Sequence, residues 1–296
     1  MKKFNEKSCT LCPRECRADR TVGAGVCGEG AEARIAKVML HRWEEPCISG
    51  ADPERGSGAI FFSGCPLHCV YCQNRDISAG GAGKTYTPKE LSEIFKRLES
   101  EGAYNINFVT PTHFTDKIIE ALDIYRPNLP IVFNTSSYEK EETIAALSGY
   151  ADIFLADLKY SSEEIAKKYS KAPDYPEVAL KAIKKMVEIT GAPQLDGDGM
   201  MKKGTIVRLL VLPGQRKDAV LSLERLKEAV GTEDVILSLM SQYTPEFAPA
   251  DCKELRRRTT TFEYEFVRDR AVDLGFSGFG QDRQSAKAAY TPNFTE

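Results

Sequence analysis

Residues 60–74 read I-F-F-S-G-C-P-L-H-C-V-Y-C-Q-N, and this stretch decides how the rest of the chain is interpreted. The apolar residues 59–62 predict a buried strand, which ends where Ser63 and Gly64 interrupt it. Three cysteines follow at C-x3-C-x2-C spacing: Cys65, Cys69 and Cys72. Three thiolates in one short loop converge on a single centre, and soft sulfur ligands select iron–sulfur clusters or zinc. Because a closed structural site uses four protein ligands, three ligands indicate a centre with one open position.

This loop resembles the cluster motif of radical S-adenosylmethionine (SAM) enzymes, C-x3-C-x-aromatic-C, with Tyr71 in the aromatic position. The resemblance implies a [4Fe-4S] cluster whose free iron is chelated by the amino and carboxylate groups of SAM. It also implies one-electron cleavage of SAM to a 5′-deoxyadenosyl radical that abstracts hydrogen, and an electron donor such as flavodoxin or ferredoxin. From the residues alone, a zinc knuckle or a few buried free thiols are the alternatives.

The composition is that of a soluble globular protein, with 42% hydrophobic and 28% charged residues. The net charge of −3 provides no basic field, so a nucleic-acid partner is not expected. We expect no membrane association, since no apolar run approaches a membrane span and the first residues show no signal peptide. Nine cysteines without a secretory signal favour metal ligands in a reducing compartment, and therefore a cytoplasmic location.

A second cysteine set precedes the first, in C-T-L-C-P-R-E-C and V-C-G-E-G: Cys9, Cys12, Cys16 and Cys27. Four thiols can close a metal site, and we leave open whether it is an auxiliary iron–sulfur cluster, a structural zinc or no metal site. Three arginines are interleaved with the thiols, either to offset their charge or as solvated surface: Arg14, Arg17 and Arg20. Cys47 is expected to be a small buried residue, and the sequence assigns no role to Cys252.

Strands and helices alternate after the three-cysteine loop. Strands are predicted at 59–62, 105–110, 131–134, 152–159, 206–212 and 235–240, after an earlier strand at 33–41. Helices are predicted from Thr87 to near Gly102, at 116–125, 140–147, from Ser162, and at 177–189, 219–230 and 251–274. A loop is predicted at 191–204 and a glycine-rich turn at 275–282. Six alternating units predict an open α/β (β/α)6 partial TIM barrel over residues 51–282, after a cysteine-rich extension (1–50) and before a tail (283–296).

Polar residues occur where these strands end, and parallel barrels gather their chemistry at that edge. Asp157 and Lys159 share one side of their strand by its period of two, as a salt bridge or as a functional pair. The other candidates at strand ends are Thr110, Thr112, Asn134, Thr135, Ser136, Arg208 and Met240. His113 either contacts substrate or is bonded to backbone at a helix start. Arg208 requires an acidic partner, either a ligand carboxylate or a structural acid.

The resemblance extends from Cys9 to about Gln281 and is to uncharacterised relatives of pyruvate formate-lyase activating enzyme. In that branch a D-x-K contacts SAM, which makes Asp157 and Lys159 SAM-binding candidates. The resemblance also implies that residues 134–136 bind SAM or a cation. Thr110 and Thr112 would then replace an element that meets the SAM amino group, and Met240 would line the adenosine or substrate pocket. The implied substrate is a glycyl-radical enzyme. The alternatives are a peptide, a small molecule or RNA, and, in another class, a non-catalytic iron–sulfur electron carrier.

Overall fold

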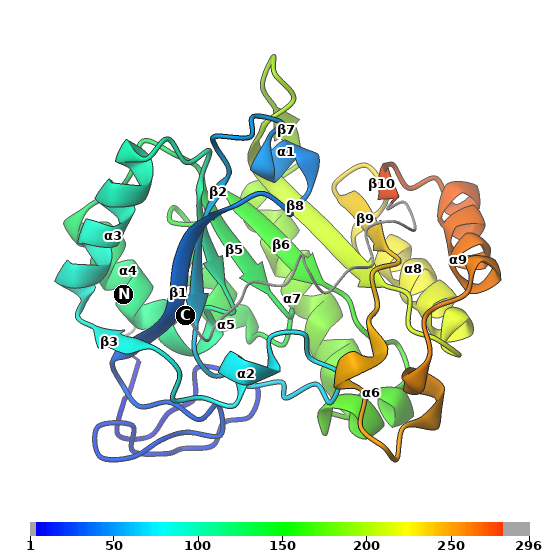
Figure 1. Cartoon of the computed structure of the whole chain (residues 1–296), viewed down its shortest axis with the longest axis horizontal. Coiled ribbons are helices and arrows are strands. Elements are labelled where there is room, and N and C mark those ends of the chain that lie inside the picture. The colour runs from blue at the N-terminus through cyan, green and yellow to red at the C-terminus, as the bar shows by residue number, and fades with distance from the viewer. Residues whose placement is uncertain (1–3, 281–296) are drawn as a thin grey trace.

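The computed structural model describes residues 4–280, and its centre is one curved, mostly parallel sheet (Figure 1). The strands that form the parallel part are β2 (Ser57–Phe62), β4 (Ile106–Val109), β5 (Ile131–Thr135), β6 (Ile153–Asp157), β8 (Met201–Leu210) and β9 (Ile236–Met240). These are the six strands that the sequence predicts, so the open α/β partial barrel is confirmed. A short strand, β10 (Gly278–Gly280), adds a further parallel edge beside β9.

Helices cover the outer face of the sheet (Figure 1). They are α3 (Pro88–Ser100), α4 (Thr115–Ile124), α5 (Glu141–Ala145), α6 (Glu163–Ser170), α7 (Tyr175–Thr190), α8 (Arg216–Val230) and α9 (Thr261–Leu274). The first of them begins as predicted, because Thr87 and Glu90 form a reciprocal capping box ahead of it. Short helical turns lie in the connections: α2 (Arg75–Ser78), η1 (Thr112–Phe114), η2 (Pro245–Phe247) and η3 (Lys253–Arg256).

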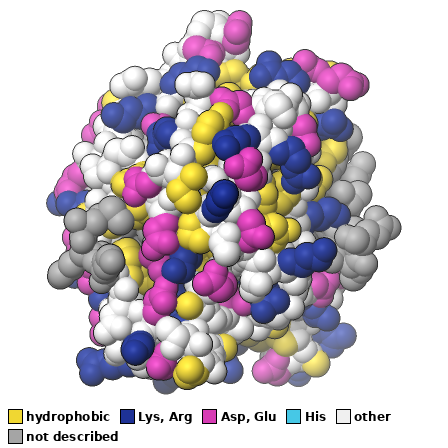
Figure 2. Space-filling view, turned by 90° about the vertical axis from the view of Figure 1, so that its left-hand side faces the viewer, with side chains coloured by type: hydrophobic (Ala, Val, Ile, Leu, Met, Phe, Trp, Pro, Cys, Tyr) yellow, Lys and Arg dark blue, Asp and Glu magenta, His cyan; other side chains and the backbone are white. Residues whose placement is uncertain are grey.

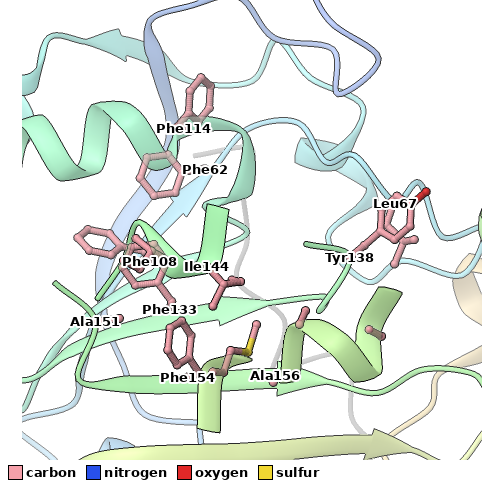
Figure 3. Close-up of a cluster of buried hydrophobic side chains, with 14 of the residues drawn as sticks. Phe62, Leu67, Phe108, Phe114, Phe133, Tyr138, Ile144, Ala151, Phe154 and Ala156 are labelled. Carbon is pink, nitrogen blue, oxygen red and sulfur yellow. The ribbon is translucent and has the colours of Figure 1, made fainter. Parts of the chain in front are cut away.

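The main core lies between the sheet and these helices (Figure 3). Phe62, Phe108, Phe133 and Phe154 come from four neighbouring strands and are at most 2% exposed. Successive rings in this row have centroids 6.2, 5.3 and 6.2 Å apart. Burying one such side chain contributes about 1.5–3 kcal/mol. Because alternate residues point to opposite faces, the same strands can carry polar groups inside the barrel.

Part of the segment 1–50 belongs to the barrel itself. Strand β1 (Ala33–His41) pairs antiparallel with β2, and β3 (Lys84–Tyr86) pairs with β1 at the sheet edge. Helix α1 (Pro46–Ser49) packs Cys47 and Ile48 against apolar side chains of β5, β6 and β8. Cys47 is therefore a small buried residue, as predicted, and α1 lies at the amino ends of the strands (Figure 1).

Three local predictions are wrong. The helix predicted over 251–274 is interrupted, since η3 ends at Arg256 and a capping box between Thr260 and Glu263 starts α9 anew. The loop predicted at 191–204 contains β7 (Gln194–Leu195), which pairs with the early residues of β8. The glycine-rich turn predicted at 275–282 includes β10. The predicted tail, 283–296, lies outside the described residues.

Acidic and basic side chains are interspersed on the face shown in Figure 2, as the small net charge leads one to expect. Between residues 4 and 280, none of the helices combines the length and the apolar character that crossing a bilayer requires.

Candidate active site

The three-cysteine loop leaves β2 through a turn that only glycine allows. Gly64 has φ 79°, and a Cβ on it would lie 2.5 Å from the carbonyl oxygen of Cys27. His68 also has positive φ, and its Nε2 lies 2.7 Å from the carbonyl oxygen of Val26. The loop is therefore held against residues 26–27 of the N-terminal segment.

The loop lines a cavity of about 250 Å³ at the carboxyl ends of the strands. Of the sequence-predicted residues at the strand ends and in the loop, the structure brings these to its wall: Cys65, Cys69, Tyr71, Cys72, Thr110, Asn134, Thr135, Ser136, Asp157, Lys159, Arg208 and Met240. Thr112 is not among them. It is buried, and its hydroxyl donates to Glu139 Oε1 at 2.5 Å.

The three loop thiols suit a sulfur-bound cofactor. Burial, reinforced by the neighbouring thiols, raises the pKa of Cys65 to about 12 and that of Cys72 to about 11. Such thiols become thiolates readily only when a metal centre takes the proton's place. No three His, Cys, Asp or Glu side chains within residues 4–280 are gathered around a point as the ligands of a single ion are. The donor set, three thiols from one loop facing one cavity, fits a cluster with an open iron.

Tyr71 belongs to a cluster of tyrosines behind the loop. Its ring meets those of Tyr160, Tyr169 and Tyr243 at centroid distances of 6.0–6.4 Å, all edge-on. Its hydroxyl accepts a hydrogen bond of 2.7 Å from Tyr160. Because the ring is 6% exposed, its main contribution is to hold the loop backbone between Cys69 and Cys72.

Asp157 and Lys159 form an ion pair on the wall of the same cavity, with Lys159 Nζ 2.6 Å from Asp157 Oδ2. Tyr175 braces the pair, because its hydroxyl accepts from the backbone N–H of Lys159 at 3.0 Å and donates to the carbonyl of Asp157 at 2.8 Å. Burial lowers the pKa of Lys159. The charges of Asp157 and then Cys69 raise this pKa by more than burial lowers it, so the pKa lies well above its ordinary value. A permanent cation therefore faces the cysteines.

Thr110 ends β4 in a strained conformation. Its φ of 58° is unusual for a β-branched residue, and its N–H donates to the carbonyl of Asn134 at 2.9 Å. Such strain is commonly found at functional sites. Thr135 lines the cavity, but its hydroxyl donates to Glu139. Burial raises the pKa of Glu139 to about 7, and the hydroxyls of Thr112 and Thr135 moderate this increase.

His113 lies outside the cavity wall and is bonded to backbone, which was the second of the two alternatives. Its Nε2 lies 2.6 Å from the carbonyl oxygen of Ser63, the residue that follows β2. Burial lowers the pKa of His113 to about 3, so the ring is neutral at physiological pH. The histidine secures the start of the loop.

Arg208 meets two glutamates that sequence reasoning missed. Its Nε donates to Glu45 Oε1 at 2.8 Å, and its guanidinium also bonds Glu44. Burial raises the pKa of Glu45, but the charge of Arg208 and its hydrogen bonds lower it more, so the net pKa is below normal. Glu44 lines the cavity and accepts from Asn107 Nδ2 at 3.1 Å. A sequence signal for this contact was available. Arg208 required an acidic partner, and residues 44 and 45 are consecutive acids that directly precede Pro46.

The four N-terminal cysteines, all among the described residues, lie near one another, although no three of them surround one point as the ligands of a single ion do. Cys9, Cys12 and Cys27 are buried, and the sulfurs of Cys16 and Cys27 lie 3.4 and 3.5 Å from the point where a Cβ on Gly25 would be. Burial raises the pKa of Cys27, and Cys9 and Cys16 add to that increase. Among the interleaved arginines, Arg20 is 4% exposed, with Nη1 3.9 Å from Cys9 Sγ. Four neighbouring thiols beside a buried cation, with no single-ion geometry among them, suit an anionic iron–sulfur cluster better than one zinc ion.

Comparison with solved structures supports the fold. The crystal structure of Streptococcus suis SuiB gives a TM-score of 0.51 at 12% identity, over 79% of this chain and 51% of SuiB. SuiB bound to precursor peptide SuiA gives 0.50 at 12% identity, over 75% and 48%. The chain thus spans about half the length of SuiB, and the likeness is one of fold.

Sequence comparison reaches further along the chain. An uncharacterized protein of Methanocaldococcus jannaschii is 28% identical over 270 residues, which are 88% of this chain and 72% of that protein. The 7-carboxy-7-deazaguanine synthase of Methanothermobacter thermautotrophicus is 28% identical over 108 residues, 36% of this chain and 44% of the synthase. The family model of the radical SAM superfamily matches residues 59–226, more than half of the chain and the part that carries the three-cysteine loop and most of the cavity wall. The chain therefore belongs to the radical SAM superfamily.

Proposed function

We propose that the protein is a radical SAM enzyme in which Cys65, Cys69 and Cys72 hold a [4Fe-4S] cluster and SAM occupies the adjoining cavity. When bound, the cluster supplies the electron that cleaves SAM, giving a 5′-deoxyadenosyl radical that abstracts hydrogen from a substrate. One observation carries the proposal: the three thiols and the Asp157–Lys159 pair line the same cavity of about 250 Å³. A non-catalytic electron carrier has no use for such a cavity.

The side chains of the wall suit the parts of SAM. The ammonium of Lys159 is available to a carboxylate, and its partner Asp157 holds it in place. The strand ends at Thr110 and residues 134–136 offer hydroxyl, amide and carbonyl groups to the amino group and ribose. Met240 offers an apolar surface to the adenine or to substrate. Arg208 is engaged by two glutamates, so we assign it to shaping the floor of the cavity.

For the hydrogen donor we propose a glycine of a partner glycyl-radical enzyme. The D-L-K of β6 and the N-T-S of β5, which resemble elements of the activating enzymes, both reach the cavity and support this assignment. A small-molecule substrate is the second candidate, favoured by the similarity to 7-carboxy-7-deazaguanine synthase over 36% of this chain. A flavodoxin or ferredoxin would provide the electron.

We further propose that Cys9, Cys12, Cys16 and Cys27 bind an auxiliary iron–sulfur cluster, which their proximity to one another and to Arg20 supports. Zinc, the other alternative, is less favoured, because no three of these thiols within the described residues surround one point. All nine cysteines are free thiols, which is consistent with a reducing, cytoplasmic location.

The test is anaerobic reconstitution with iron and sulfide, followed by dithionite and SAM. We expect a brown protein that releases 5′-deoxyadenosine, and no release from Cys69→Ala. Cys47→Ala is the matched control, since Cys47 lies at the other end of the barrel and should leave release unchanged. Zinc in the loop site with no 5′-deoxyadenosine would overturn the proposal. A glycine-centred doublet in electron paramagnetic resonance, seen only with the partner present, would identify the activase role.

A further inference from the structure

Arg14 connects the N-terminal cysteines to the three-cysteine loop. It lies between Cys12 and Cys16 in the C-P-R-E-C sequence, and its guanidinium donates to four backbone carbonyls. Two belong to the loop, with Nε 2.9 Å from the oxygen of Pro66 and Nη2 3.3 Å from that of Leu67. The Pro66 and Leu67 carbonyls lie between the first two loop cysteines in sequence, so Arg14 holds the part of the backbone that sets their spacing.

The other two carbonyls lie at the carboxyl end of α6. Arg14 Nη2 lies 2.8 Å from the oxygen of Ser170, and Nη1 lies 2.7 Å from that of Lys171. A cation is favourable there, because the last carbonyls of a helix have no partners within the helix and carry partial negative charge. The guanidinium also lies over the ring of Tyr138, 5.2 Å from its centroid. A planar, five-donor group is required to bridge two segments in this way, and lysine cannot replace it.

Other contacts on both sides of Arg14 fasten the same segment. The N–H of Cys65 donates to the carbonyl of Cys27 at 3.2 Å, so a member of each cysteine set is joined directly. Glu15, the next residue after Arg14, forms an ion pair of 2.6 Å with Lys140. In Figure 1 the N-terminal coil lies beside α2, at the end of the barrel where the loop lies.

We propose that the N-terminal cysteine lobe, residues 9–27, is a clamp on the radical loop, with Arg14 as its positioning residue. The four lobe thiols would hold an iron–sulfur cluster, which would fix the backbone of residues 12–16 and thereby the direction of the Arg14 side chain. The clamp in turn holds the loop carbonyls and keeps the three cysteines ready for their cluster. This inference rests on the proposed function, and it gives the lobe a mechanical role that does not depend on electron transfer.

The first test measures retention of the loop cluster. Wild type, Arg14→Ala, Arg14→Lys and the control Arg17→Ala are reconstituted anaerobically, and the rate of iron loss to a chelator is followed. We expect loss to be about tenfold faster in both Arg14 variants, since several hydrogen bonds to the loop and α6 disappear. Arg17 is an exposed residue of the same lobe, so Arg17→Ala should lose iron at the wild-type rate. Arg14→Lys keeps the charge and provides a second variant if Arg14→Ala does not fold.

The second test asks whether lobe metal and Arg14 act as a unit. Cys12→Ala should accelerate iron loss from the loop site as Arg14→Ala does, and the double variant should be no faster than either single variant. The paramagnetic signal of the reduced, SAM-bound cluster reports the loop site separately from lobe iron. The clamp would be overturned if the double variant lost iron at a rate that multiplies the effects of the two single variants. It would also be overturned if Arg14→Lys retained the loop cluster as well as wild type does. If wild type itself assembles no cluster, the proposed function fails instead, so the two failures are distinguishable.

Discussion

The hydroxyl of Ser170 lies 3.3 Å from the sulfur of Cys69 and donates a hydrogen bond to it. Ser170 is the last residue of α6, and its Oγ is also 2.9 Å from the hydroxyl of Tyr160, which bonds Tyr71. A row of hydroxyls thus runs through an otherwise apolar core to one proposed cluster ligand. Hydrogen bonds to cluster sulfurs favour the reduced, more negative state and so raise the reduction potential.

Ser170→Ala should therefore lower the reduction potential of the cluster. Loss of a hydrogen bond of about 1 kcal/mol corresponds to a decrease on the order of 40 mV for one electron. Redox titration monitored by electron paramagnetic resonance measures it. Ser162→Ala is the matched control, because Ser162 caps the start of the same helix. It should cost about 1 kcal/mol of stability without changing the potential. Equal potentials in wild type and Ser170→Ala would contradict the assignment.

Lys159→Met should weaken SAM binding roughly 10- to 100-fold, the usual effect of losing a hydrogen bond to a charged group. The physical reason is that Lys159 is held protonated beside Asp157, so the wild-type cavity always presents a cation. Equilibrium dialysis of SAM against reconstituted protein, at matched iron content, gives the affinity. Lys185→Met serves as the control, since Lys185 pairs with Glu188 at the surface. Unchanged SAM affinity in Lys159→Met would exclude the proposed contact.

The barrel was predictable because its signals are local. Each parallel strand is a short apolar run, and each helix begins or ends at a recognisable residue, such as Thr87 or Gly231. The carboxyl ends of parallel strands meet at one edge of the barrel, so the sequence alone predicts that Asp157 and Lys159 lie beside the loop.

The remaining site features depend on pairing between distant segments. Arg208 signalled a need for an acid, but 163 residues separate it from Glu45, and only the turn into α1 brings them together. Arg14 was indistinguishable from a solvated charge, because its four partners are backbone carbonyls, which leave no trace in side-chain pattern. Thr112 follows Thr110 by two residues, yet the left-handed turn at Thr110 directs the chain away from the cavity.

Replacing Arg208 by Met should destabilise the fold by about 3–5 kcal/mol, since two buried carboxylates lose their cation. The control Arg268→Met removes a surface charge that is 48% exposed and should change stability by at most about 0.5 kcal/mol. Urea unfolding measures both. A loss below 1 kcal/mol in Arg208→Met would show that the triad is not held as described.

The ion pair between Arg208 and Glu45 also predicts how stability changes with pH. In wild type the pKa of Glu45 is depressed, so its contribution is present above its ordinary pKa of 4.5 and is lost as the pH falls further. In Arg208→Met the charge and hydrogen bonds of Arg208 are lost, and burial, the largest influence on Glu45, outweighs the remaining hydrogen bond from Ser238, so the pKa of Glu45 is raised. Arg208→Met should therefore recover stability as the pH is lowered from 7 toward 5. In wild type, Glu45 produces no such increase.

Glu139 contributes in the opposite direction. Its pKa in the folded protein is raised from 4.5 to about 7 by burial, so between these values the folded chain keeps a proton that the unfolded chain has released. Stability must then decrease as the pH rises from 4.5 to 7, by up to roughly 3 kcal/mol from this residue. Glu139→Gln keeps an oxygen that accepts from Thr112 and Thr135 but has no proton to lose. Its unfolding free energy should be flatter over this range and higher than that of wild type at pH 8.

Urea unfolding at pH 5, 6, 7 and 8, with metal content held constant, tests this difference. Glu141→Gln is the appropriate control, because Glu141 is an exposed acid at the start of α5, two residues along the chain. It should reproduce the wild-type pH profile. If Glu139→Gln were less stable than wild type at pH 8, the raised pKa of Glu139 and the cost of ionising it in the folded protein would be contradicted.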